Sequence, residues 1–237
     1  MTIDQYLFGA LPYVVAAVAI VGTLWRWRRA PFSVSSLSSQ LLESRKLYWG
    51  SVPFHWGLSL ILVGHLVGLI IPQGLAAWNG ASLRLYVTEV TGLALAIWAA
   101  IGIAVLAYRR LTDARVRTVT TPMDLVVLAV VAVQIATGIW VAVGYRWGSA
   151  WGPGVLGSYV RSLLVFQPDP AYVAPLPLAV KAHVLAFFVF LALFPFSRLV
   201  HIITLPAQYL TRPWQRVVAM RRPPDPSYVL PRRGRGG

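Results

Sequence analysis

Five apolar stretches, each close to twenty residues long, limit what this chain can fold into. They run over residues 7–25, 51–72, 87–108, 123–145 and 178–205. A helix of about 20 apolar residues crosses the ~30 Å hydrocarbon core of a bilayer. Only 12% of the 237 residues are charged and 57% are hydrophobic, whereas typical soluble domains are about 25% charged. The sequence therefore predicts an all-α, polytopic membrane protein with five transmembrane helices.

The basic residues are distributed unevenly between these predicted spans. Seventeen of the 21 Lys and Arg residues lie in the connections after the first and third spans or at the end of the fifth span and beyond. The remaining four, on the other side, are Arg84, Arg146, Arg161 and Lys181. Because cytoplasmic connections are enriched in Lys and Arg, we expect the N-terminus outside and the C-terminus in the cytoplasm. The net charge of +14 is thus interpreted as a signal of topology in the cytoplasmic (inner) membrane among its lipids, and not of nucleic acid binding.

The chain is predicted to hold one membrane domain. The first apolar stretch is followed by its basic residues, which is the reverse of a cleaved signal peptide, so we expect an uncleaved span. Residues 1–222 then form the five-helix domain. Residues 223–237 (PPDPSYVLPRRGRGG) are rich in Pro, Arg and Gly, a composition that predicts a disordered cytoplasmic tail.

All four histidines lie in two of the five spans. His55 and His65 belong to the second, and His183 and His201 to the fifth. Since these spans run in opposite directions, His55 is predicted level with His201 near the inner side, and His65 level with His183 near the outer side. The rise per residue separates His55 from His65 by about 15 Å and His183 from His201 by about 27 Å. Helix tilt is expected to absorb this difference, and Pro195 predicts a bend in the fifth span.

The spacing of eighteen residues predicts that His183 and His201 share one face of a helix. Imidazole suits iron, copper, zinc or nickel, but a zinc site usually takes three or four protein ligands. A haem supplies four nitrogens itself and needs only two axial ligands. The chain has no cysteine, which excludes thiolate-held clusters and covalent haem. The pattern therefore predicts two non-covalent b haems, whose iron the four histidines bind.

Small and basic residues near the histidines have two interpretations each. Gly57, Gly64 and Gly68 leave room for a flat macrocycle against the second span, or they serve ordinary helix packing. Arg110 and Arg198, near the inner side, pair with haem propionates or anchor the helices at the membrane surface.

Several stretches carry a resemblance to a known family. They are SSQLL (38–42), VGH (63–65), YRRL followed by RVRTVTT (108–121), LFPFSRLVHI (193–202) and PAQYLTR (206–212). With the four histidines, they make the chain similar to the gamma subunit, the dihaem cytochrome b, of membrane-bound respiratory nitrate reductase. The similarity extends to about residue 220.

The resemblance implies roles for particular residues. It gives the inner haem the axial ligands His55 and His201 and the outer haem His65 and His183, which is the pairing derived from topology. It places quinol oxidation beside the outer haem, at Gly64, His65, Gly68 and Arg84. Better-known members of the family have lysine where this chain has Arg84, and the two cations are not interchangeable. Arg110 matches an arginine near the inner haem's propionates.

The resemblance also implies an activity and partners. The chain would be the quinol-oxidising electron-transfer subunit of an enzyme complex, with menaquinol or ubiquinol as substrate. Electrons would pass from the outer haem to the inner haem, then to an iron–sulfur subunit on the cytoplasmic face and a molybdenum subunit that reduces nitrate.

Other interpretations remain open at the level of sequence. The chain could be the cytochrome b anchor of a related quinone-linked oxidoreductase of sulfur or heterodisulfide metabolism. It could also be a transporter whose histidines relay protons, although carboxylates along such a path are missing. A third reading has the histidines only joining helices by hydrogen bonds. For Arg84 alone, the alternatives are a contact with lipid head groups or an ion pair with Glu89.

Overall fold

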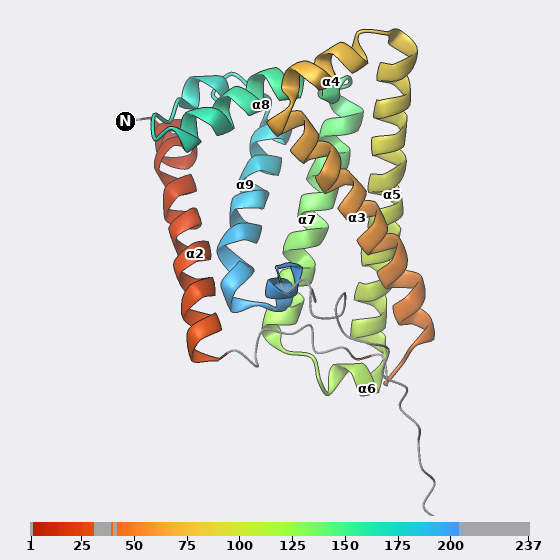
Figure 1. The fold of residues 1–237 in the computed structure, drawn as a ribbon. Helices are drawn as coiled ribbons and strands as arrows, with labels where there is room; N and C mark the ends of the chain where they lie inside the picture. Colours follow the sequence, from red (N-terminus) through yellow and green to blue (C-terminus); the bar gives the residue numbers. More distant parts are fainter. Residues whose placement is uncertain (1, 31–38, 40–41, 204–237) are drawn as a thin grey trace, which may run out of the picture. The chain divides into compact units, whose positions relative to one another are not determined.

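The computed structural model describes residues 2–30, 39 and 42–203. All of them belong to one compact unit, Met1–Thr204. This unit is built of helices (Figure 1). The predicted tail, residues 223–237, lies outside the described residues, so its disorder stays a prediction.

Five helices of the described part are long and apolar enough to cross a membrane. The first runs over Ile3–Arg29 as α1 (Ile3–Gln5), the π-helical η1 (Tyr6–Ala10) and α2 (Leu11–Arg29). The others are α3 (Arg45–Ile70), α5 (Ser82–Thr112), α7 (Pro122–Gly144) and α9 (Leu178–Leu193) with the 3₁₀ turn η4 (Phe194–Phe196). The prediction of an all-α chain with five apolar spanning helices is therefore confirmed.

Shorter helices close the two ends of the bundle. The helices α4 (Pro72–Asn79) and α8 (Gly148–Leu164) lie across one end, called here the α8 end, and α6 (Ala114–Arg117) lies at the opposite, α6 end (Figure 1). A further 3₁₀ turn, η3 (Pro170–Tyr172), follows α8. Much of the connection between the predicted fourth and fifth spans is therefore the helix α8.

Side-chain caps explain where several helices begin. Thr121 and Asp124 form a reciprocal capping box at the start of α7, with Pro122 in the first turn. The Glu43 carboxylate accepts hydrogen bonds from the backbone N–H groups of Lys46 and Leu47, at 2.8 and 3.2 Å, at the start of α3. Such contacts satisfy backbone donors that have no partner within the helix.

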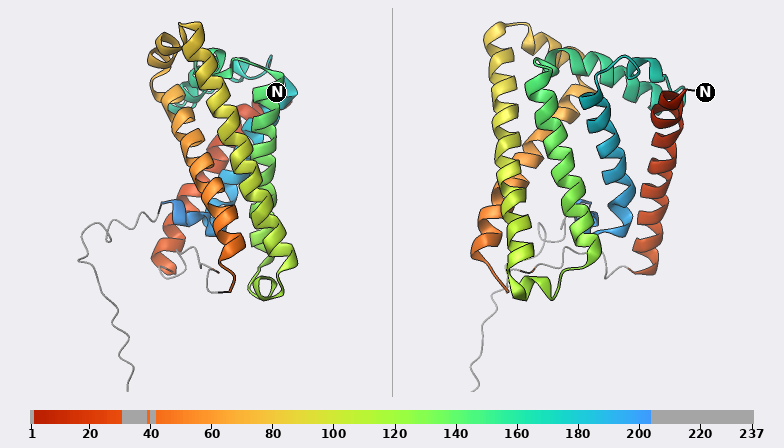
Figure 2. Two further views of the ribbon diagram at one scale, coloured as in Figure 1. Left: turned by 90° about the vertical axis from the view of Figure 1, so that its right-hand side faces the viewer. Right: turned by 180° about the vertical axis from the view of Figure 1, so that it is seen from behind.

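Close backbone contact joins α3 to α5. A Cβ added at Gly102 would lie 2.5 Å from the Phe54 nitrogen, and one added at Gly57 would lie 2.8 Å from the Leu95 carbonyl oxygen. The helices α5, α7, α9 and α2 then follow one another across the bundle, with α3 running obliquely across α5 and α7 (Figure 2). Gly57 therefore serves helix packing, which was one of its two predicted uses.

The predicted fifth span, 178–205, is wrong at its C-terminal part. The helix α9 ends at Leu193, and 3₁₀ turns follow at Phe194–Phe196 (η4) and Arg198–Ile202 (η5). Pro195 was expected to bend a continuous helix, but the helix stops two residues before it. A proline has no N–H to continue the helical bonding, and the N–H of Phe194 bonds to the Leu191 carbonyl instead.

The helix α2 holds this break in place. Nη1 of Arg26 donates hydrogen bonds to the carbonyl oxygens of Pro195 and Ser197, at 2.8 and 2.7 Å. A Cβ added at Gly22 would lie 2.9 Å from the Pro195 ring, so the chain turns directly against α2. The consequence is that His183 and His201 do not share one helix, and the expected ~27 Å rise between them does not apply.

Candidate functional site

The structure brings the four histidines together as two facing pairs. His55 on α3 and His201 on η5 have ring centroids 6.3 Å apart, with an interplanar angle of 62°. His65 on α3 and His183 on α9 have ring centroids 6.3 Å apart, with an angle of 43°. These are the partners that antiparallel topology predicted. The break after Leu193 is what allows both pairs to form, because it shortens the path from His183 to His201.

The separation of the rings fits one metal ion between each pair. An imidazole nitrogen binds a first-row metal at about 2.0–2.1 Å, and the ring centre lies about 1.1 Å behind that nitrogen, so two rings on opposite sides of one ion have centres about 6 Å apart. Each histidine pair therefore has the separation that one metal ion between two imidazoles requires.

Backbone carbonyls determine which nitrogen of three histidines is available. Nδ1 of His55 lies 2.8 Å from the Ser51 carbonyl oxygen, Nδ1 of His65 lies 2.9 Å from that of Ile61, and Nδ1 of His201 lies 2.6 Å from that of Arg198. A carbonyl only accepts, so Nδ1 carries the hydrogen and Nε2 keeps its lone pair for a metal. Metal-binding histidines are usually held in this way.

His183 is held by side-chain and backbone atoms of α7. The Thr137 hydroxyl lies 2.8 Å from the Val133 carbonyl oxygen, to which it donates, and 3.0 Å from Nδ1 of His183. With its hydrogen on the Val133 carbonyl, the hydroxyl has a lone pair that can accept Nδ1–H of His183, and this is the tautomer that leaves the lone pair of Nε2 for a metal. A Cβ added at Gly138 would lie 3.0 Å from Cε1 of His183, so the ring lies against the α7 backbone.

The donor set suits a haem better than a bare ion. Among the described residues, no group of three or more His, Cys, Asp or Glu could hold a metal ion. Two imidazoles per site are sufficient only where another molecule supplies the remaining ligands, as a porphyrin does. A Cβ added at Gly64, one residue from His65, would meet no atom within 4 Å. The space beside Gly64 is therefore open, whereas a Cβ added at Gly68 would lie 3.3 Å from Cγ of Pro153 in α8.

An ion-pair cluster lies beside the His55–His201 pair, near the α6 end. Asp124 of α7 binds Arg110 of α5 at 3.0 Å through Oδ2, and Arg198 of η5 at 2.9 Å through Oδ1. The Asp124 side chain is only 7% exposed. The two arginines expected near haem propionates thus converge on one carboxylate, and the cluster carries one net positive charge.

Arg84 lies in the first turn of α5 at the α8 end. Its Nε donates a hydrogen bond of 2.6 Å to the Trp78 carbonyl, and its guanidinium carbon lies 5.3 Å from the centre of the Trp78 ring. Glu89 is not its partner, since this carboxylate accepts hydrogen bonds from the backbone N–H and hydroxyl of Ser149 at the start of α8. The alternative of an Arg84–Glu89 ion pair is therefore wrong for this structure.

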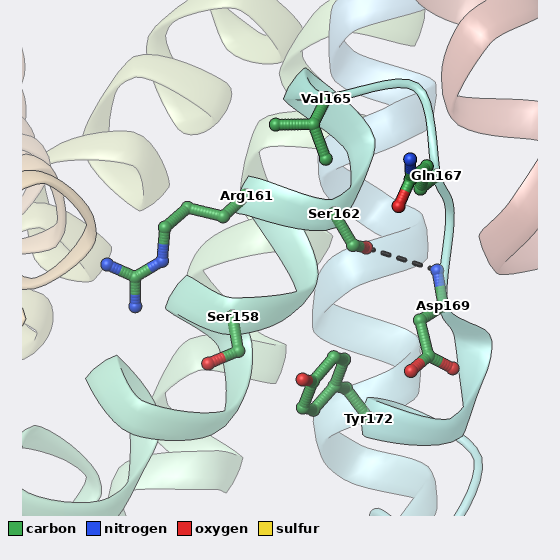
Figure 3. Close-up of a pocket in the computed structure, with 7 residues that line it drawn as sticks. All are labelled: Ser158, Arg161, Ser162, Val165, Gln167, Asp169 and Tyr172. Atoms are coloured by element: carbon green, nitrogen blue, oxygen red, sulfur yellow. Dashed lines mark hydrogen bonds between the residues drawn. The ribbon is translucent and has the colours of Figure 1, made fainter.

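A polar cleft of about 350 Å³ lies at the α8 end, apart from the histidine pairs. Its lining includes Ser158, Ser162, Asp169 and Tyr172, from α8 and the segment that follows it. Figure 3 shows the Ser162 hydroxyl bonded to the Asp169 backbone N–H, while the Arg161 side chain extends away from these groups. The cleft contributes no ligand to either pair.

Sequence reasoning missed the supporting residues of both sites. Thr137 and Gln134 are polar residues in an otherwise apolar span, and that isolation was a usable signal. Gln134 lies 3.4 Å from both ring nitrogens of His183. Asp124 is the one acidic residue of the α7 helix, but its two arginine partners come from distant segments and no spacing rule relates them.

Comparisons with known proteins agree with this arrangement. The chain matches the family described as nitrate reductase gamma subunit over residues 4–220. It is 35% identical over 216 residues to the nitrate reductase gamma chain of Bacillus subtilis, covering 88% of this chain and 95% of that one. It is 28% identical over 221 residues to the respiratory nitrate reductase 1 gamma chain of Escherichia coli, covering 92% and 98%. It is also 36% identical over 222 residues to the nitrate reductase-like protein NarX of Mycobacterium tuberculosis, covering 89% of this chain and 33% of that protein.

The fold and the paired histidines together define the class of the molecule as a polytopic membrane cytochrome b. The family match covers all five spanning helices and both histidine pairs. The chain belongs to the nitrate reductase gamma subunit family. It is accordingly a membrane subunit of a nitrate reductase complex, and the predicted resemblance is confirmed.

Proposed function

We propose that this subunit binds two b haems and oxidises quinol at the α8 end of the bundle. The observation that carries the proposal is the equal 6.3 Å separation of two histidine pairs, which suits one iron between each pair. His55 and His201 would hold the inner haem, and His65 and His183 the outer one. When bound, the haems supply one-electron redox chemistry that links quinol on one side of the membrane to an acceptor on the other.

The orientation is part of the proposal. The α6 end carries Arg109 and Arg110 at the end of α5, and Arg115 and Arg117 of α6. The last turn of α2, which is also basic, lies at the same end of the bundle. Of the basic residues at the α8 end, Lys181 forms an ion pair with Asp4 at 3.1 Å. The positive-inside rule then favours an α6 end in the cytoplasm and an N-terminus outside.

The quinol site is proposed beside His65. Gly64 leaves open space on α3, and Gly68 fixes the contact of this segment with α8 at Pro153. Arg84 is held by the Trp78 carbonyl through Nε and by the Ala77 carbonyl through Nη2, so Nη1 is the nitrogen proposed to donate to the quinol. A charge-assisted hydrogen bond from Arg84 to a quinol oxygen would stabilise negative charge as the quinol protons leave.

The α6 end is proposed to dock the partner subunits, an iron–sulfur protein and a molybdenum protein that reduces nitrate. Here Arg109, only 2% exposed, binds the Glu43 carboxylate at 2.7 Å and the Ser39 hydroxyl at 3.0 Å. This contact fixes the segment before α3 against the end of α5 and joins two of the stretches that carry the family resemblance. A fixed surface at the haem nearest the cytoplasm is what electron transfer to a partner requires.

The test is a pyridine haemochrome assay and an optical titration of the purified complex. The proposal expects two b haems per chain, both removed by acid–acetone because the chain has no cysteine to bind them. It also expects reduction of both haems by a quinol. A chain without haem would refute the proposal and favour a role as a structural anchor. A single haem per chain would show that one of the two histidine pairs does not bind haem.

A further inference from the structure

The helix α7 contains no histidine, yet it contacts both ligand-bearing segments of the last span. At its middle it meets His183 of α9, and at its beginning it meets Arg198, which precedes His201 in η5. His65, which faces His183, and His55, which faces His201, each bond through Nδ1 to a backbone carbonyl of their own helix, α3. Nδ1 of His201 also bonds to a carbonyl of its own segment, so the contact of α7 with this ligand runs through Arg198, whereas its contact with His183 is direct.

Thr137 and Gly138 both bring α7 against the ring of His183. The Thr137 hydroxyl donates its hydrogen to the Val133 carbonyl at 2.8 Å, which leaves its lone pair for Nδ1–H of His183 at 3.0 Å. A Cβ at Gly138 would lie 3.0 Å from Cε1 of His183, so glycine at this position lets the ring lie directly against the α7 backbone. An acceptor on the outer nitrogen makes an imidazole a stronger metal ligand.

Asp124 fixes His201 through one intermediate residue. Its carboxylate binds Nε of Arg198 at 2.9 Å and Nη1 of Arg110 at 3.0 Å, and accepts the N–H of Thr121 at 3.0 Å. The carbonyl of the same Arg198 accepts Nδ1–H of His201 at 2.6 Å. Asp124 thus ties the η5 turn to the start of α7 and to the end of α5, and it places a negative charge beside the inner site.

We propose that α7 is the positioning element for both fifth-span ligands, with Thr137 setting the ring of His183 and Asp124 setting, through Arg198, the place of His201. The inference rests on the proposed haem sites and goes beyond them, because neither residue is a ligand. A more strongly donating imidazole, or a nearby carboxylate, stabilises the oxidised over the reduced state of a bound iron. Each residue should therefore lower the reduction potential of one haem and leave the other unaffected.

The experiment compares Thr137→Val and Asp124→Asn in the full complex. Valine keeps the shape of threonine without the hydroxyl, and asparagine keeps an oxygen for the Thr121 N–H while removing the charge. Thr137→Ser is the matched control that keeps the hydroxyl. The readouts are optical redox titration of each haem, the low-temperature EPR spectrum of the oxidised haems, and amide hydrogen exchange of Arg198–Ile202.

The expected result is selective. Thr137→Val should raise the potential and change the EPR signal of the outer haem alone, and Thr137→Ser should keep wild-type values. Asp124→Asn should raise the potential of the inner haem alone and speed exchange in Arg198–Ile202. Loss of one haem from the corresponding variant, with the other intact, would also support the inference.

Two other results would overturn it. Unchanged potentials and EPR signals in both variants, with two haems bound, would show that α7 only packs against these segments, and the haem assignment would stand. Loss of both haems from either variant would show a general effect on folding. A wild-type complex without haem would instead refute the proposed function, which separates the two failures.

Discussion

At the scale of single residues, Arg84 offers a sharp test of the quinol site. We expect Arg84→Ala to slow quinol-dependent haem reduction at least ~10-fold, or about 1.4 kcal/mol of transition-state stabilisation, because a donor to the quinol oxygen is lost. Arg84→Lys should restore much of the rate, since the resemblance places lysine there in other members. Stopped-flow absorbance measures the rate, and the dithionite-reduced spectrum, which should not change, is the control. Wild-type kinetics in a correctly assembled Arg84→Ala complex would remove this residue from the site.

The ligand pairs make a second prediction at this scale. Replacing either His65 or His183 with alanine should remove the outer haem and quinol oxidation, because a single axial imidazole no longer holds that group. The inner pair shares neither residue and should keep its haem, so the haem content should fall to half. The pyridine haemochrome assay measures this content. If every such variant lost both haems, the independence of the two pairs would be wrong.

At the scale of helices, two glycines of α5 should respond in opposite ways to the same change. Gly102→Ala places a methyl group 2.5–2.9 Å from backbone atoms of α3, so the helices must separate, at a cost of about 1–3 kcal/mol. Gly92→Ala meets no atom within 4 Å and gains helix propensity of up to ~1 kcal/mol. The temperature at which haem absorbance is lost should fall for Gly102→Ala and hold or rise for the Gly92→Ala control. Equal effects would contradict the described packing of α3 on α5.

The junction between α3 and α5 also predicts a pH dependence. Burial alone would raise the pKa of the Glu43 carboxyl, but the Lys46 N–H, the Arg109 guanidinium and the Leu47 N–H together lower it below its ordinary value of 4.5. A lowered pKa contributes stability above pH 4.5 that is lost as the pH falls through the folded-state value. Hydrogen exchange of residues 42–47 should therefore be faster in Glu43→Gln than in wild type at pH 7, with the difference disappearing in acid. A difference that persists at low pH would show that charge is not its cause.

The helices show how far sequence carries the fold and where it fails. The five apolar stretches were sufficient to predict five spanning helices. The opposite directions of the second and fifth spans were sufficient to predict that His55 faces His201 and that His65 faces His183. Hydropathy could not locate the end of α9, because the stretch LFPFSRLVHI (193–202) is still mostly apolar. The helix ends there because Pro195 cannot continue the helical hydrogen bonds. Nor could hydropathy find the Asp124 cluster, whose members meet only through tertiary packing. Residues far apart in sequence, such as Arg26 and Ser197, supply the hydrogen bonds that make the break possible.

At the scale of the whole molecule, the distribution of charge is the basis for the proposed orientation, with the α6 end in the cytoplasm. The α6 end gathers most of the Arg and Lys residues that the structure describes, and the same end carries the fixed contact of Arg109 with Glu43. Moving these cations across a bilayer is costly, so the orientation determines on which side quinol releases its protons and on which side the partner subunits dock. The proposed direction of electron transfer depends on this single assignment.

The absence of cysteine from the sequence makes the orientation directly measurable. One cysteine can be introduced at Gln167, after α8, or at Ala114 of α6, both exposed positions, and a membrane-impermeant maleimide then reports on one site at a time. In intact spheroplasts we expect labelling of the Gln167→Cys variant and none of Ala114→Cys until the membrane is broken. Because neither change alters a charge, the positive-inside signal stays intact. The opposite pattern would place the α6 end outside, and quinol oxidation at His65 and Arg84 would then face the cytoplasm.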